Sequence, residues 1–203
     1  MNFLAHTYLS GENSLIRIGN FMGDWIKGNE FKKFPEDIQK GVLLHRSIDY
    51  YTDNHPIVKQ SKNRFSEKYH KYSGILIDIY YDHFLAKEWE VFSTVPYNEY
   101  LLTLKEGLLK DMVHFSDEIQ EFIPRFMDHG WMNSYPTLHG IENVLTGMVK
   151  HTSLPDKTDD AIKIFEMYYN NFREEFYDYF PQLVDYIEDR FGISVKHQMG
   201  NKK

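Results

Sequence analysis

Cysteine is absent from the 203-residue sequence, and its absence limits the chemistry available to the chain. Disulfides, thiolate metal sites and cysteine nucleophiles are excluded. Any metal site must therefore use histidine, aspartate, glutamate and water as ligands. The sequence also lacks a P-loop and a G-x-S-x-G nucleophile elbow, so neither of these hydrolase motifs can provide its function.

Long apolar runs are missing as well. No stretch of about 18 uninterrupted apolar residues occurs, so we expect no membrane span. The first residues, MNFLAH, lack the basic start and apolar run of a signal peptide, so we expect a cytoplasmic protein. No basic tract interleaved with aromatic residues is present, which argues against a nucleic-acid partner.

The sequence has no convincing alternation of apolar and polar residues over several strands, no long internal repeat and no low-complexity linker. Instead, apolar residues make up 42% of the chain and recur at helical spacing in every long segment. The sequence therefore predicts an all-α fold. We expect one helical bundle over residues 1–195, followed by a mobile tail at 196–203.

Proline positions mark several of the expected helix ends. Pro35, which two acids follow, predicts a helix start, and the run Asn-His-Pro at 54–56 predicts its end and the next start. Pro181 is expected to separate a last short helix from a long one that begins at Thr158. The remaining helices are expected over 13–28, 75–89, 96–111, 117–128 and, from 137 or 138, to 148.

The segment 75–89, ILIDIYYDHFLAKEW, has apolar residues in nearly every helical direction, which indicates a central buried helix. It nevertheless contains Asp78, Asp82 and His83. The helix dipole explains Asp78 near the helix start, but Asp82 lies too far along for that explanation. Because a buried aspartate is rare unless it is paired or binds a metal, we expect Asp82 or His83 to belong to a site.

The stretch 41–56, GVLLHRSIDYYTDNHP, places His45 and Asp49 one helical turn apart on the same face, and Asp53 extends the line. An unpaired charge beside the apolar neighbours would be costly, and either a bound metal or mutual hydrogen bonding would remove that cost. A His–Asp pair that only orders the helix is the alternative interpretation.

Two further candidates precede this stretch. Alone, His6 is typical of a satisfied core histidine and Asp24 of a solvent-facing acid, while Gly19 and Gly23 could admit a close backbone approach. Taken together, the candidates form a histidine–carboxylate set without sulfur: His6, Asp24, His45, Asp49, Asp82 and His83. Such a set suits Mn²⁺, Fe²⁺, Zn²⁺ or Mg²⁺ and metal-assisted phosphoester hydrolysis.

Five blocks in matching order resemble the acyl carrier protein phosphodiesterase family: MNFLAH, GNFMGDWIKG, GVLLHRSIDYYTDNHP, IDIYYDHFLA and IENVLTGM. That family is regarded as a divergent branch of the all-helical, HD-type metal phosphohydrolases. The resemblance implies a phosphodiesterase that acts on the carrier of fatty acid biosynthesis, converting holo acyl carrier protein to the apo protein and free 4′-phosphopantetheine. It also implies a divalent metal, typically Mn²⁺, with Mg²⁺ or Fe²⁺ as alternatives.

Carried onto this sequence, the resemblance implies catalytic or orienting roles for His6 and Asp49. It implies metal ligands or their immediate neighbours at Asp24, His45, Asp82 and His83. The adjacent His-Asp order typical of HD proteins occurs here only in reverse, as Asp82-His83. The competing functions are a metal phosphohydrolase acting on a small nucleotide or other phosphodiester, and a non-enzymatic helical binding module.

The net charge of −7 is unevenly distributed. Residues 1–75 contain 11 Lys/Arg against 8 Asp/Glu, whereas residues 76–203 contain 12 against 22. An acidic partner such as holo acyl carrier protein would therefore have to dock near the first part of the chain. The candidate docking residues are Lys32, Lys33, Arg46, Lys59 and Lys62. Ordinary solvated helix faces are the alternative, and the sequence leaves the oligomeric state open.

Overall fold

The computed structural model describes residues 1–195, and within them it contains helices and no strand. The predicted all-α fold is confirmed. The tail expected at 196–203 lies outside the described residues. In chain order the elements are α1 (Phe3–Tyr8), α2 (Ser14–Phe21), η1 (Glu30–Lys33), α3 (Glu36–Asn54), α4 (Pro56–Tyr69), η2 (His70–Tyr72), α5 (Ser73–Lys87), α6 (Trp89–Phe92), α7 (Tyr97–Asp111), η3 (Met112–His114), α8 (Asp117–Asp128), α9 (Trp131–Ser134), α10 (Leu138–His151), α11 (Thr158–Met167) and α12 (Tyr169–Phe191).

Three of the expected helix boundaries are wrong. The long helix expected from Thr158 ends at Met167, and α12 begins at Tyr169. The helix expected over 13–28 ends at Phe21, because the chain turns there to bring Gly23 against the imidazole of His45. Pro181 lies inside α12 and does not separate two helices. Apolar side chains on both sides of Pro181 are fully buried, and their burial offsets the hydrogen bond that proline cannot donate.

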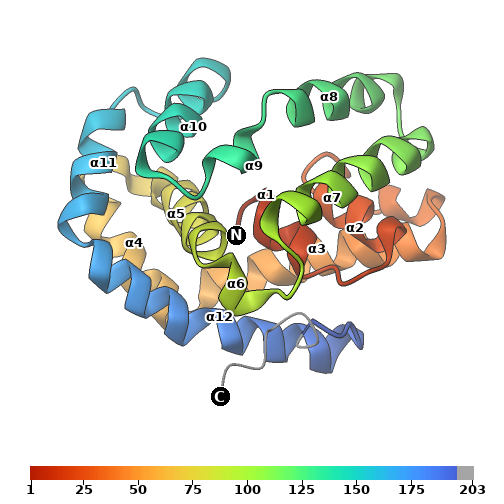
Figure 1. Cartoon of the computed structure of the whole chain (residues 1–203), viewed down its shortest axis with the longest axis horizontal. Coiled ribbons are helices and arrows are strands. Elements are labelled where there is room, and N and C mark those ends of the chain that lie inside the picture. Colours follow the sequence, from red (N-terminus) through yellow and green to blue (C-terminus); the bar gives the residue numbers. More distant parts are fainter. Residues whose placement is uncertain (196–203) are drawn as a thin grey trace.

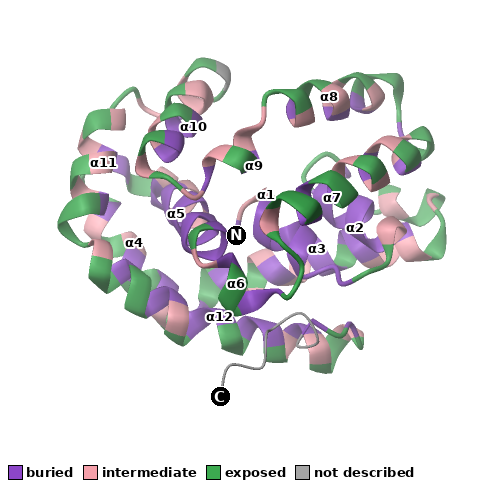
Figure 2. Cartoon of the chain, viewed as in Figure 1, coloured by how far each residue is buried: buried purple, intermediate pink, exposed green. Residues whose placement is uncertain are grey.

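Helix α5 lies at the centre of the molecule, where Figure 1 shows it nearly end-on, in contact with α1, α4, α10 and α12. Its residues are buried on all sides, as expected for a helix that is apolar all round (Figure 2). Tyr80 stacks on Phe165 of α11 with ring centroids 3.8 Å apart. Each fully buried side chain of this size contributes about 1.5–3 kcal/mol, so aromatic burial is a main source of stability here.

Helices α2 and α3 pack with their backbones in direct contact. A Cβ atom on Gly19 would lie 2.3 Å from the carbonyl oxygen of Ile38, and one on Gly41 would lie 2.2 Å from that of Ile16. The close approach predicted for Gly19 is therefore confirmed. It fixes the end of α2, including Asn20, beside the middle of α3, where the His–Asp pair lies.

None of the helices in the described part of the chain is long and apolar enough to cross a lipid bilayer.

Candidate metal centre

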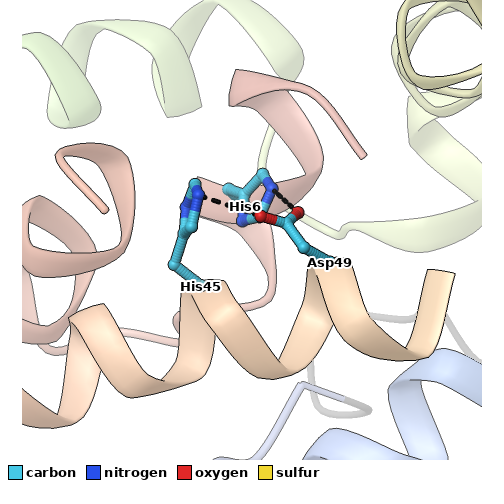
Figure 3. A group of neighbouring side chains, drawn as sticks. All are labelled: His6, His45 and Asp49. Atoms are coloured by element: carbon cyan, nitrogen blue, oxygen red, sulfur yellow. Dashed lines mark ion pairs between the residues drawn. The ribbon is translucent and has the colours of Figure 1, made fainter. Parts of the chain in front are cut away.

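His6, His45 and Asp49 come together from two helices, as Figure 3 shows. His45 and Asp49 project from one face of α3, and His6 projects from α1. One ligand atom from each residue lies within 4.8 Å of the others. Among residues 1–195, this is the group of His, Asp or Glu side chains close enough to hold a metal ion.

The two imidazoles converge on one carboxylate. Nε2 of His6 lies 3.2 Å from Oδ1 of Asp49, and Nε2 of His45 lies 3.1 Å from Oδ2. The two rings stack with centroids 4.2 Å apart. Both histidines are buried, whereas the Asp49 side chain is 40% exposed, so the carboxylate forms the accessible side of the group.

Asn20 fixes the orientation of both imidazoles. Its side-chain Oδ1 accepts from Nδ1 of His6 at 2.8 Å, and its backbone oxygen accepts from Nδ1 of His45 at 2.8 Å. The side-chain nitrogen Nδ2 of Asn20 donates to the backbone oxygen of His6 and to Oγ of Ser10. These two bonds identify the other side-chain atom, which faces Nδ1 of His6, as the oxygen. Both Nε2 atoms are therefore directed at Asp49, the arrangement that protein ligands of a metal usually have.

The chemistry of this donor set fits a cation. With its proton on Nδ1, a neutral His6 points the lone pair of Nε2 at Oδ1 of Asp49 and at the backbone oxygen of Met1, 3.1 Å away. Three electron-rich atoms then face one another without a proton between them. A divalent cation with nitrogen and oxygen ligands removes that repulsion, and a set of two histidines and carboxylates suits Mn²⁺, Fe²⁺ or Zn²⁺.

Asp24 stands at the rim of the group. Its Oδ1 lies 3.4 Å from Nε2 of His45, and its side chain is 71% exposed. The preceding residue, Gly23, lies directly against the imidazole, because a Cβ atom there would approach Cγ of His45 to 2.2 Å. The chain after α2 therefore positions Asp24 and supports the ring of His45.

Electrostatics distinguish the members of the group. Burial alone would lower the pKa of His45, but hydrogen bonds and charge from Asp24 and Asp49 raise it to about 9. Burial and the neighbouring His45 lower the pKa of His6. Although burial opposes ionisation of Asp49, the hydrogen bond from His45 holds its pKa well below the usual range. The group thus combines an ionised carboxylate, a neutral imidazole and a second imidazole that holds a proton until a cation replaces it.

A cavity of about 300 Å³ opens onto this group. Phe3 and Phe21 form an apolar part of its wall, and Thr52 and Asp53 continue the line of α3. Lys71, Gly74, Ile75 and Asp78 also line the cavity. A ligand can therefore reach His6, His45 and Asp49 from solvent.

The structure does not bring Asp82 and His83 into this group. The Asp82 carboxylate is fully buried and accepts from the backbone N–H groups of Leu4 at 2.8 Å and of Asn2 and Ala5 at 3.3 Å. It thereby holds the start of α1 against α5. His83 donates from Nδ1 to the backbone oxygen of Tyr135 at 2.7 Å, and its Nε2 contacts the Tyr169 hydroxyl at 2.9 Å. The hydrogen-bonding atoms of both side chains have partners inside the core, and neither residue belongs to the group formed by His6, His45 and Asp49.

Sequence reasoning missed two residues of the site. Asn20 is a fully buried polar residue on a helix whose buried residues are mostly apolar, and that contrast was the available signal. Asp78 was attributed to the helix dipole, but it lines the cavity and pairs with the amino group of Met1 at 2.9 Å. Neither could be assigned without knowing which elements meet.

Comparison with known proteins decides the family. A model described as acyl carrier protein phosphodiesterase matches residues 1–183. The chain belongs to this family. The relatives include acyl carrier protein phosphodiesterases of Photorhabdus laumondii, 27% identical over 94% of this chain and 96% of the relative, and of Yersinia pestis, 28% identical over 91% and 96%. The protein of the same name from Escherichia coli K12 is also 28% identical over 91% and 96%. No solved structure matches.

Family membership agrees with the resemblance in the five sequence blocks, which is therefore confirmed. The candidate docking residues occupy different places. Lys32 and Lys33 are exposed in η1, before the start of α3. Arg46 donates to the backbone oxygen of Ile26 at 2.9 Å and packs over the ring of Phe31, so it holds the loop after Asp24. Lys59 and Lys62 line a second cavity, described below.

Proposed function

We propose that this protein is a metal-dependent phosphodiesterase that hydrolyses holo acyl carrier protein to apo acyl carrier protein and 4′-phosphopantetheine. The observation that carries the proposal is the convergence of His6 and His45 on Asp49 beneath an open cavity. Family membership supplies the substrate, because the relatives are named as acyl carrier protein phosphodiesterases. We propose that the reaction takes place in the cytoplasm.

His6, His45 and Asp49 would hold the divalent metal, with Asp24 beside them at the rim. Mn²⁺ is the proposed ion, and Mg²⁺ or Fe²⁺ are alternatives. When bound, such an ion withdraws electron density from a phosphoryl oxygen and lowers the pKa of water.

The protein's own residues perform the remaining tasks. Asn20 keeps both imidazoles in the orientation that exposes Nε2, so that no energy is needed to reorient them during the reaction. Asp24 lies at the rim with its side chain 71% exposed, and its carboxylate can accept a hydrogen bond from an attacking water. Phe3 and Phe21 exclude solvent from one side of the cavity, which strengthens the electrostatic interactions within it.

The decisive experiment is incubation of the purified protein with holo acyl carrier protein and Mn²⁺, followed by intact mass measurement of the carrier. We expect complete conversion to the apo form, release of 4′-phosphopantetheine, and loss of both after chelation. Unchanged carrier mass at full metal loading would overturn the proposal. Turnover of a small phosphodiester alone would favour the competing phosphohydrolase, and no turnover of either would favour a binding module.

A further inference from the structure

A second cavity, of about 380 Å³, lies beside the metal cavity. It is formed by α4 and the turn that leads into α5, and its walls include Lys59, Lys62, His70 and Lys71. Asp53, Lys71 and Gly74 belong to the walls of both cavities. The two cavities therefore adjoin along the end of α3, so that a molecule bound in one can reach into the other.

Positive charge dominates this second cavity. Three lysines line it against one carboxylate, that of Asp53, which pairs with Nζ of Lys62 at 2.6 Å. His70 has a φ of 46°, which among residues 1–195 is the positive φ found outside glycine. Such a strained backbone persists only where the surrounding structure holds it, and strained residues of this kind concentrate at binding sites. We call the surface formed by Lys59, Lys62, His70 and Lys71 the basic cavity.

We propose that the basic cavity is the docking surface for the acidic carrier protein, and that the metal cavity receives the phosphodiester from it. This inference rests on the proposed function. Acyl carrier proteins are small and acidic, whereas residues 76–203 of this chain carry 22 acids against 12 bases and would repel them. A local basic surface beside the metal cavity would offset this repulsion, because it attracts the carrier to the place where the scissile bond must bind.

Continuity with the metal cavity is the reason for choosing this surface over the other lysines. Lys32 and Lys33 precede α3, while Lys59 and Lys62 follow it, and a helix of 19 residues is about 28 Å long. Neither Lys32 nor Lys33 lines the metal cavity or the basic cavity. Lys33 lies 3.5 Å from Glu30, as Lys62 lies 2.6 Å from Asp53, so each lysine pair has one acidic neighbour. The two lysine pairs carry equal charge, so one serves as the matched control for the other.

The test compares Lys59→Glu/Lys62→Glu with Lys32→Glu/Lys33→Glu, which change the charge by the same amount at the two ends of α3. Binding of apo acyl carrier protein is measured by fluorescence anisotropy at low salt, so that the readout does not depend on hydrolysis. We expect the first variant to raise Kd by roughly tenfold or more and the second by less than about twofold. The difference should shrink near 0.5 M salt, because screening then acts over only a few ångström.

Equal effects of the two variants, an unchanged Kd in Lys59→Glu/Lys62→Glu, or no dependence on salt would overturn the assignment of the docking surface. So would failure of the wild-type protein to bind the carrier at low salt. The proposed function is judged separately by the mass measurement. If the wild-type protein binds the carrier through the basic cavity but never removes its prosthetic group, the docking surface stands and the hydrolytic function fails.

Discussion

The molecule contains two pairs of a histidine and an aspartate that are close in sequence. His45 and Asp49 lie on α3, and Asp82 and His83 lie on α5. In the first pair the carboxylate is 40% exposed, and its oxygens contact two imidazole nitrogens at the wall of an open cavity. In the second pair the carboxylate is fully buried, and its oxygens face backbone N–H groups. The same residue types thus form a candidate reaction centre in one place and part of the core in the other.

The pKa shifts of the two pairs run in opposite directions. Burial raises the pKa of Asp82 to about 7 and lowers that of His83 to about 4. In the α3 pair mutual contacts overcome burial, so that the pKa of His45 rises to about 9 and that of Asp49 falls well below its usual range. Burial disfavours charge, whereas a charged partner favours it. The comparison teaches that burial of an acid and a histidine does not make a site unless their free lone pairs also converge.

Among the substitutions that test the difference between the two pairs, His45→Ala should have the largest effect on metal binding. Removing one of the two converging Nε2 atoms should weaken Mn²⁺ binding by more than about 100-fold, the upper end of the loss seen when only a ligand's supporting partner is removed. The helices should stay packed, because the ring faces a cavity. Isothermal titration with Mn²⁺ and a circular dichroism melt measure the two effects. Retained affinity in a folded variant would show that the centre lies elsewhere.

Gly23→Ala should have the next largest effect. The new Cβ would meet Cγ of His45 at 2.2 Å, so the imidazole must tilt away from Asp49. We expect Mn²⁺ affinity to fall about 10- to 100-fold, as when a ligand loses its supporting contact. Gly107→Ala is the matched control, because its Cβ would meet only ordinary contacts 3.8 Å away. If both variants bind equally well, the support of His45 by the backbone is unimportant.

Metal affinity should depend on pH through His45. Its pKa of about 9 means that, without metal, the folded protein keeps a proton on His45 that a cation must displace. Affinity should therefore rise about tenfold per pH unit up to about pH 9.

Stability of the metal-free protein should change in the opposite direction. Between about pH 6.5 and 9 the folded state holds more protons than the unfolded state, so raising the pH lowers the free energy of unfolding. Thermal melts in chelator at several pH values measure this change. The control is His45→Gln, whose stability should not depend on pH in this range.

Asp82→Ala should have the smallest effect on metal binding. The variant leaves buried N–H groups of Leu4 and Ala5 without an acceptor, which should lower the free energy of unfolding by about 1–3 kcal/mol. Mn²⁺ affinity of the folded protein should change by less than about threefold. Urea denaturation and titration of the folded variant separate the two quantities. Complete loss of Mn²⁺ binding at wild-type stability would restore Asp82 as a ligand.

Much of the fold follows from local patterns in the sequence. Pro35 and Pro56 mark helix starts through their fixed φ, and the spacing of apolar residues in 75–89 indicates a helix buried on every side. The pattern failed at Pro181, because packing on both sides of a proline can retain a helix that local propensity would end. Propensity acts within a few residues, whereas burial acts between segments distant in the chain.

The site divides along the same line. The sequence by itself determined that any metal ligands are histidines and carboxylates, and that His45 and Asp49 share a helix face. Only the tertiary structure decided that His6 joins them while Asp82 and His83 do not. Each of these residues has a lone pair that could bind either a metal or a hydrogen-bond donor, and the choice depends on which backbone groups lie opposite. Those groups belong to α1 and to Tyr135, which are remote in sequence from α5, so no local pattern could reveal them.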